Sequence, residues 1–276
     1  MSTVGTLPGR FAFVRFGNGP APLVVLPGLA FDNPAPKAAE ARIYGWAMRR
    51  LAVGRTVTVL KRPRGLAPTA GPELGTEDLA DLYAGVLTDE LGQVDVMGLS
   101  TGGLIAQQLA LRHPALVRRL VLAVSGTRIA EAGRQMCQTW LGQAERRDWR
   151  SLRGGLTAAA VDGRAKQRIA RLLGGSGRRP DPRDVADFAM TARAVLRHDT
   201  TGALSGMRVP TLVLGGSDDP FFPEPVLRAT AAEIPGAQVA VHAGGHGVPK
   251  HHSRWLQDQV TTFLAVSAHP ADPVNP

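Results

Sequence analysis

Cysteine is nearly absent from the sequence: Cys137 is the single one among 276 residues. One cysteine excludes a disulfide framework and a metal site made of several thiolates, so we expect it to be a buried, unpaired thiol. Long apolar runs are missing as well, since none approaches the ~20 residues of a membrane-spanning helix. Residues 1–10 contain no apolar stretch of signal-peptide length. These absences predict a cytoplasmic protein without a membrane span.

Acidic residues are outnumbered, because 23 Asp and Glu stand against 32 Lys and Arg, which gives a net charge of +9. Residues 127–205 carry most of the excess, with 15 Lys and Arg against 8 Asp and Glu. A basic segment attracts nucleic acid, anionic lipid or an acidic substrate. Aromatic residues make up only 5% of the chain, however, and no dense basic block is interleaved with them, as base stacking requires. We therefore expect a small-molecule partner and no nucleic acid.

The first half of the chain alternates between strand and helix patterns. Leu79, Leu82, Tyr83 and Val86, for example, follow the spacing of one helix face. The patterns predict strands at residues 11–16, 23–26, 57–61, 94–97 and 120–124, and helices at residues 37–52, 76–91 and 101–112. Later in the chain they predict strands at residues 211–214 and 238–242 and a helix at residues 253–265. This order indicates the α/β class, with a mostly parallel central sheet flanked by helices.

The alternation fails between residues 127 and 205, where the sequence is helical and rich in loops. The simplest organisation is a sheet domain of residues 1–126 and 206–266, interrupted by a helical cap of residues 127–205. The last ten residues, 267–276, contain three prolines, and we expect a flexible tail there.

The segment Gly98-Leu99-Ser100-Thr101-Gly102 has the pattern G-x-S-x-G between a predicted strand and a predicted helix. This context is that of a nucleophile elbow, a strand-to-helix turn so sharp that its flanking positions need small residues. The turn lifts the serine hydroxyl above the sheet edge, and the N-terminus of the following helix favours negative charge there. Ser100 is therefore the candidate nucleophile, and a purely structural Gly-Ser turn is the alternative.

A serine hydroxyl needs a base, and the base needs an orienting carboxylate. With such an elbow the chain order is Ser, then Asp or Glu, then His. The strand at residues 211–214 runs into an acidic turn that contains Asp218 and Asp219, and the strand at residues 238–242 runs into Gly245-His246-Gly247. The carboxyl ends of neighbouring parallel strands meet at one edge of a sheet, so we expect these residues to approach the elbow.

These motifs resemble the α/β-hydrolase superfamily, in particular its small cap-bearing esterase and haloperoxidase-like branch, over roughly residues 10–265. The resemblance implies Asp219 as the acid, because it precedes Pro220 in the family pattern G-x-x-D-P, with Asp218 as the competitor. It implies His246 as the base, through the family's G-H near the C-terminus. The alternatives are three nearby histidines: His242, His251 and His252.

Two backbone N–H groups are needed to hold an oxyanion, and one comes from Thr101, directly after the nucleophile. Leu26-Pro27-Gly28-Leu29 resembles the family's His-Gly-x loop with Pro27 in place of histidine, which implies Leu29 as the second donor and Ala30 as the alternative. Arg62-Pro63-Arg64-Gly65 stands where the family usually has D-x-R-G, with Arg62 in the place of the aspartate. We interpret that segment as a structural loop.

The resemblance implies hydrolysis of an ester-like bond of a small molecule through an acyl-enzyme, with no metal or cofactor. The same residues also serve carbon–carbon bond hydrolysis, lactone opening and acyl transfer, and a non-catalytic ligand-binding protein is the alternative from another class. Phe221 and Phe222, which follow Asp219 closely, and Trp140 of the insertion are the candidates for substrate binding. Trp149 and Phe188 are further aromatic candidates, with core packing as the alternative. The sequence does not set the oligomeric state.

Overall fold

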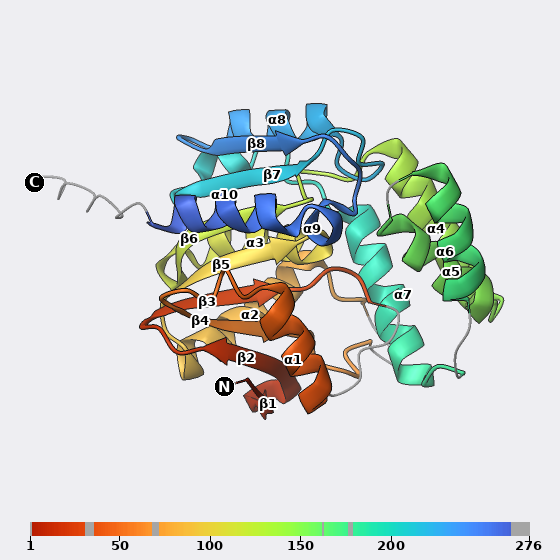
Figure 1. The fold of residues 1–276 in the computed structure, drawn as a ribbon, viewed down its shortest axis with the longest axis horizontal. Coiled ribbons are helices and arrows are strands. Elements are labelled where there is room, and N and C mark those ends of the chain that lie inside the picture. Colours follow the sequence, from red (N-terminus) through yellow and green to blue (C-terminus); the bar gives the residue numbers. More distant parts are fainter. Residues whose placement is uncertain (1, 31–35, 68–71, 162, 176–178, 266–276) are drawn as a thin grey trace, which may run out of the picture.

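A computed structural model describes residues 2–30, 36–67, 72–161, 163–175 and 179–265 (Figure 1). The predicted flexible tail at residues 267–276 lies outside these residues. Within them, none of the helices combines the length and the hydropathy that a membrane crossing requires.

One sheet of eight strands organises the chain, in the order β1-β2-β4-β3-β5-β6-β7-β8. The strands from β3 onward pair in parallel, while β2 pairs antiparallel with both β1 and β4. This confirms the predicted α/β class with a mostly parallel sheet. The strands are β1 (Thr3–Leu7), β2 (Phe11–Gly17), β3 (Ala21–Leu26), β4 (Arg55–Leu60), β5 (Val94–Leu99), β6 (Val117–Ala123), β7 (Thr211–Gly216) and β8 (Gln238–His242).

Helices cover both faces of the sheet, because the central strands are apolar on both faces. Leu23 and Val25 of β3 belong to a core shared with α1 (Ala38–Ala47) and α10 (Ser253–Ala265). Val24 and Leu26 of the same strand belong to the opposite core, shared with α2 (Thr76–Glu90), α3 (Thr101–Arg112) and α8 (Glu224–Glu233). The period of two in β3 thus divides its side chains between the two cores.

Four α-helices of the described residues come between β6 and β7, and in Figure 1 they lie together beyond the carboxyl ends of the parallel strands. They are α4 (Glu131–Glu145), α5 (Trp149–Ala159), α6 (Arg164–Gly174) and α7 (Pro182–Arg197). Buried side chains of this insertion, among them Trp140 and Phe188, belong to the same apolar cluster as Phe221 and Phe222 of the sheet domain. The insertion therefore packs onto the sheet domain through a shared core.

The structure also departs from the sequence-based expectations. Strand β1 and helix α8 were not predicted, and a short helix α9 (Val248–His251) precedes α10. The first helix, expected at residues 37–52, ends at Ala47. A run of turns occupies residues 48–54 instead.

Candidate active site

Ser100 stands at a strained turn between β5 and α3. Its backbone has φ 52° and ψ −119°, one of few non-glycine residues with positive φ among those described. The turn requires glycine at two positions. A Cβ on Gly98 would collide with the backbone of Gly103, and a Cβ on Gly102 would collide with the carbonyl group of Leu26. The turn has the shape that the G-x-S-x-G pattern predicts.

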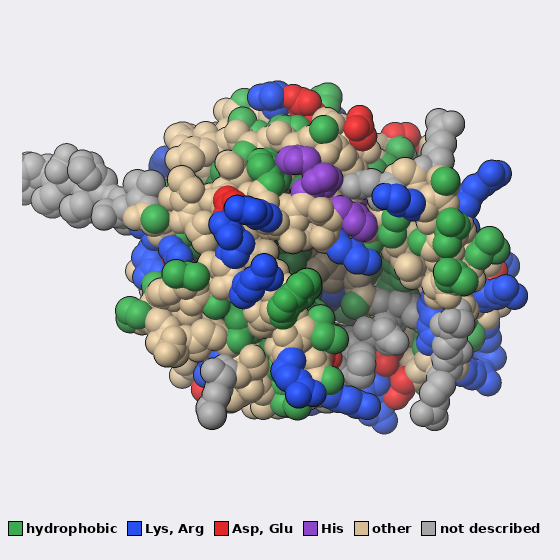
Figure 2. Space-filling view, in the orientation of Figure 1, with side chains coloured by type: hydrophobic (Ala, Val, Ile, Leu, Met, Phe, Trp, Pro, Cys, Tyr) green, Lys and Arg blue, Asp and Glu red, His purple; other side chains and the backbone are tan. Residues whose placement is uncertain are grey.

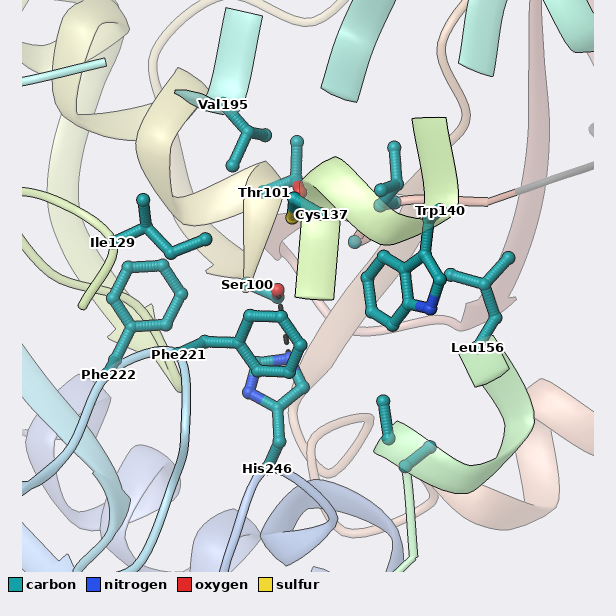
Figure 3. Close-up of a pocket in the computed structure, with 14 residues that line it drawn as sticks. Ser100, Thr101, Ile129, Cys137, Trp140, Leu156, Val195, Phe221, Phe222 and His246 are labelled. Carbon is teal, nitrogen blue, oxygen red and sulfur yellow. Dashed lines mark hydrogen bonds between the residues drawn. The ribbon is translucent and has the colours of Figure 1, made fainter. Parts of the chain in front are cut away.

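His246 lies between Ser100 and Asp219. Its Nε2 is 3.0 Å from the Ser100 Oγ, and its Nδ1 is 2.7 Å from the Asp219 Oδ2 (Figure 3 shows the first contact). A carboxylate only accepts hydrogen bonds, so Nδ1 carries the proton and Nε2 is left to accept the serine hydroxyl proton. The structure brings together the three residues that the sequence assigned to nucleophile, base and acid.

Asp219 is held from both carboxylate oxygens. Its side chain is fully buried, and its Oδ1 accepts the backbone N–H groups of Phe221 at 2.8 Å and Phe222 at 3.2 Å. The competitor Asp218 is exposed, and its backbone N–H donates to the carbonyl of Gly244. Of the two aspartates, Asp219 is therefore the one whose carboxylate contacts His246.

The three alternative histidines have other partners. The His242 ring packs against that of His252, with ring centroids 4.1 Å apart and the planes tilted by 36°, and its Nδ1 lies 2.6 Å from the carbonyl oxygen of Ala243. The His251 Nε2 lies 3.1 Å from the Ala160 carbonyl oxygen. Histidine side chains gather on the face shown in Figure 2. None of these three lines the cavity at Ser100 in the described part of the chain.

Both expected oxyanion donors border the cavity at Ser100. Thr101 is the first residue of α3, where a backbone N–H has no acceptor within its own helix. Leu29 follows Gly28, at which a Cβ would lie 3.3 Å from the Cβ of Ser100, so this loop passes directly beside the nucleophile. The alternative donor residue Ala30 is exposed and borders a different, smaller cavity.

A cavity of about 200 Å³ opens above Ser100 and is mainly apolar (Figure 3). All three predicted substrate-binding residues, Phe221, Phe222 and Trp140, line it. The Phe221 ring packs against two other rings: its centroid is 4.6 Å from that of the His246 ring and 5.6 Å from that of the Trp140 ring. Trp149 and Phe188 do not line this cavity; Phe188 is buried in the core.

Several wall residues were not singled out from the sequence. Ile129 follows β6, Leu156 comes from α5 and Val195 from α7. Cys137 of α4 also lines the wall, and burial raises the pKa of its thiol to about 12. It is unpaired, as expected from a single cysteine. Among the described residues, no three His, Cys, Asp or Glu side chains group together in a way that would hold a metal ion.

The sequence pattern of the alpha/beta hydrolase family matches residues 23–260. The chain belongs to this family. The match includes the elbow, the acidic turn and His246, and confirms the superfamily that the motifs indicated. The residues that lie together at Ser100 are thus those of a hydrolase family member.

Two relatives illustrate how similar individual proteins are to this chain. The poly(3-hydroxyalkanoate) depolymerase of Ectopseudomonas oleovorans is 31% identical over an alignment 169 positions long, and this alignment covers 57% of this chain and 56% of that protein. Polyketide synthase ThaQ of Burkholderia thailandensis is 30% identical over an alignment 276 positions long, and this alignment covers 94% of this chain and 12% of the synthase. The chain thus spans only part of the length of either relative.

A solved structure, the enol-lactonase from Burkholderia xenovorans, superimposes with a TM-score of 0.72. The two share 20% sequence identity, and the match covers 95% of this chain and 99% of the other. At this identity the likeness establishes the common fold.

Proposed function

We propose that the chain is a serine hydrolase that cleaves an ester bond of a small apolar substrate through an acyl-enzyme. The observation that carries the proposal is the pair of hydrogen-bond contacts that joins the Ser100 Oγ to His246, and His246 to the buried carboxylate of Asp219. A hydroxyl at its ordinary pKa is a poor nucleophile and needs a base within hydrogen-bond reach. In this proposal His246 is that base, and its contact with Asp219 orients the ring toward Ser100.

In the first half of the reaction, the Ser100 Oγ attacks the ester carbonyl carbon while its proton passes to the His246 Nε2. The positive charge on the imidazole is stabilised by Asp219, which keeps Nδ1 as the donor. The bond from the carbonyl carbon to the leaving oxygen then breaks, and His246 returns the proton to that oxygen. An alcohol departs and the acyl group stays on Ser100.

Water completes the cycle. The His246 Nε2 takes one proton from a water molecule, whose oxygen attacks the acyl carbon. The bond to the Ser100 Oγ breaks, the proton passes from His246 to Oγ, and a carboxylic acid leaves. In both halves the negative oxygen is expected to be held by the backbone N–H groups of Leu29 and Thr101.

The cavity argues for an apolar group of limited size. At about 200 Å³ it is smaller than the roughly 300–1,000 Å³ of drug-sized ligand sites. Among the described residues, its aromatic and aliphatic wall has no charged side chain except that of the histidine, when protonated. We expect Phe221, Phe222 and Trp140 to contact the acyl or alcohol portion of the substrate. The related depolymerase acts on a poly(3-hydroxyalkanoate), a polymer whose units are joined by ester bonds.

Residues 127–205 are proposed to act as a cap that sets substrate choice. The insertion supplies Ile129, Cys137, Trp140, Leu156 and Val195 to the cavity wall. The sheet domain supplies the reacting groups, so the two parts have separate tasks. Changes to the insertion are therefore expected to alter which substrate is used more than the chemistry itself.

Hydrolysis of 4-nitrophenyl esters with acyl chains of two to eight carbons tests this proposal. The parent protein is expected to release 4-nitrophenol with turnover, and Ser100→Ala to lose several orders of magnitude in kcat. Ser125→Ala is the matched control, because it also removes a hydroxyl near the elbow but one that has no hydrogen-bond partner among the described residues. Equal rates for the parent and Ser100→Ala would refute the proposal.

Product analysis separates the related reactions. Ester hydrolysis gives one acid and one alcohol, whereas added alcohol acceptors would give a new ester if the chain were an acyl transferase. Lactones and carbon–carbon substrates such as vinylogous 1,5-diketones are included in the same panel. A non-catalytic ligand-binding protein would turn over none of these compounds.

A further inference from the structure

Arg62 lies behind the loop that carries the expected oxyanion donor. It follows β4, and its side chain is buried together with much of its backbone, with 8% of the residue exposed. Its Nη1 donates to the carbonyl oxygen of Pro27 at 2.9 Å, and its Nη2 donates to that of Gly28 at 2.8 Å. Arg62 borders the smaller cavity that Ala30 also borders, and it is not among the described residues that line the cavity at Ser100.

The contact with the Gly28 carbonyl determines the direction of another group. That carbonyl and the Leu29 N–H belong to one peptide unit, and in a planar trans peptide the two point in opposite directions. The described part of the chain contains no cis peptide bond. Because the carbonyl oxygen accepts from Arg62, the Leu29 N–H points away from Arg62. Gly28 and Leu29 both border the cavity at Ser100.

We propose that Arg62 is a positioning residue, whose guanidinium aims and polarises the Leu29 N–H as an oxyanion donor. The inference rests on the proposed function. The positive guanidinium of Arg62 would then stand at one end of the Gly28–Leu29 peptide dipole, and the oxyanion would stand at the other end. Hydrogen bonds in such a chain strengthen one another, and a fixed charge behind the donor stabilises negative charge that develops in front of it.

The loop that carries Arg62 is itself fastened to the insertion. The carboxylate of Asp187 in α7 accepts the backbone N–H groups of Gly65, Leu66 and Ala67 at 2.6–2.9 Å. Burial lowers the pKa of Arg62, and the charge of Asp187 opposes that shift. An arginine side chain stays protonated in proteins. Helix α7 therefore helps to keep a buried cation in place under the oxyanion loop.

This role differs from simple support of the loop. A structural arginine would affect stability and substrate binding together. A residue that aims an oxyanion donor affects the transition state, in which the oxygen is negative, more than the bound substrate, in which the oxygen is neutral. The expected signature is a lower kcat with a nearly unchanged KM.

The test compares Arg62→Met and Arg62→Lys with the parent. For Arg62→Met we expect kcat for the best 4-nitrophenyl ester to fall about 10–100-fold, less than the 10²–10³ found for removal of a direct donor, with KM changed less than about threefold. Arg62→Lys keeps the charge but not the two-pronged contact, so it should recover part of the loss. Affinity for a trifluoromethyl ketone, which forms a tetrahedral oxyanion on serine, should fall in proportion to kcat. Affinity for the product carboxylic acid should not.

Arg118→Met is the matched control. The guanidinium of Arg118 also donates two hydrogen bonds, to the buried carboxylate of Asp95 at 2.9 and 2.8 Å. Arg118 lies near the start of β6, at the end of the strands opposite to Ser100. Its loss should lower the thermal unfolding temperature and leave kcat unchanged. If Arg62→Met does not fold, Arg62→Lys decides the question by the same measurements.

Two failures are distinguishable. If the parent hydrolyses no ester and no fluorophosphonate labels Ser100, the proposed function is wrong. If the parent is active but folded Arg62 variants keep kcat within about twofold, or lose ketone and product affinity equally, the role of Arg62 is wrong.

Discussion

The Nδ1 of His246 lies 2.7 Å from the Oδ2 of Asp219. The other oxygen of the same carboxylate is occupied by the backbone N–H groups of Phe221 and Phe222. Because the Asp219 side chain is fully buried and held on both oxygens, it cannot rotate without breaking several contacts. The ring of His246 is thereby held with its Nε2 toward Ser100.

Replacing Asp219 by Asn tests that orientation. The amide keeps the shape of the carboxylate, but its NH₂ group favours the wrong histidine tautomer, with the proton on Nε2. In a serine protease the corresponding change lowered kcat about 10⁴-fold, and we expect a loss of roughly 10³–10⁴-fold here. The measurement is kcat on a 4-nitrophenyl ester, with Asp218→Asn as the control because Asp218 is exposed. A larger loss in Asp218→Asn would assign the acid to that residue instead.

Replacing Gly102 by Ala tests how closely the turn at Ser100 packs against the segment that follows β3. A Cβ there would meet the carbonyl carbon and oxygen of Leu26, so Gly102→Ala must shift either α3 or the loop that follows β3. We expect activity to fall at least tenfold and the free energy of unfolding to drop by about 1–3 kcal/mol, as for overpacked sites. Gly85→Ala in α2 is the control, since a Cβ there meets no atom within 4 Å. It should gain roughly 0.5–1 kcal/mol of stability, and equal behaviour of the two variants would contradict the account.

Leu156 tests the cavity as the place of substrate choice. It is partly buried in α5 and lines the wall, so Leu156→Phe should narrow the space and leave Ser100 unaltered. We expect kcat/KM for an eight-carbon acyl ester to fall about tenfold relative to that for acetate, within the range that hydrophobic pockets discriminate. Leu172→Phe makes the same change on α6 at a residue 69% exposed. An unchanged preference in Leu156→Phe would place the substrate elsewhere.

His198 gives stability a dependence on pH. Burial lowers its pKa from 6.5 to about 4, although the charges of Glu77 and Asp199 oppose the shift. The unfolded chain therefore binds a proton between pH 6.5 and 4 that the folded chain does not, so this residue lowers the free energy of unfolding as pH falls through that window. The full effect is about 3 kcal/mol, reached near the lower limit.

The measurement is urea unfolding of the parent and of His198→Asn at pH 7.5 and pH 4.5. Asparagine retains a polar atom near the position of Nδ1, which lies 2.8 Å from the Thr76 Oγ1. The carboxylates titrate in both proteins, so the difference between them isolates His198. The parent should lose more stability than the variant on acidification, and equal losses would contradict the assignment.

The contact of His246 with Ser100 and Asp219 could be predicted from the sequence because each residue lies in a local pattern. Gly98 and Gly102 mark the turn around Ser100, and parallel strands bring the residues after β7 and β8 to the same sheet edge. The cavity wall could not be predicted in this way. Ile129, Leu156 and Val195 come from separate segments, and their convergence depends on how the helices of the insertion pack.

The missed elements have similar causes. Strand β1 is largely exposed and is defined by its pairing with β2, so its sequence shows no strong alternation. Helix α8 buries only Leu227, Thr230 and Ala231, a mixed set that gives little contrast between faces. The contact of Arg62 with the carbonyl of Gly28 joins residues 34 positions apart, and the unusual arginine in that loop gave no local sign of its target.

The central claim, an activated nucleophile at Ser100, is tested most directly by intact-mass measurement after treatment with a fluorophosphonate. The account predicts one adduct per chain, mapped to the peptide that contains Ser100, and its loss in Ser100→Ala and in His246→Ala. Ser125→Ala should be labelled like the parent. An unlabelled parent, or equal labelling of Ser100→Ala, would contradict the account.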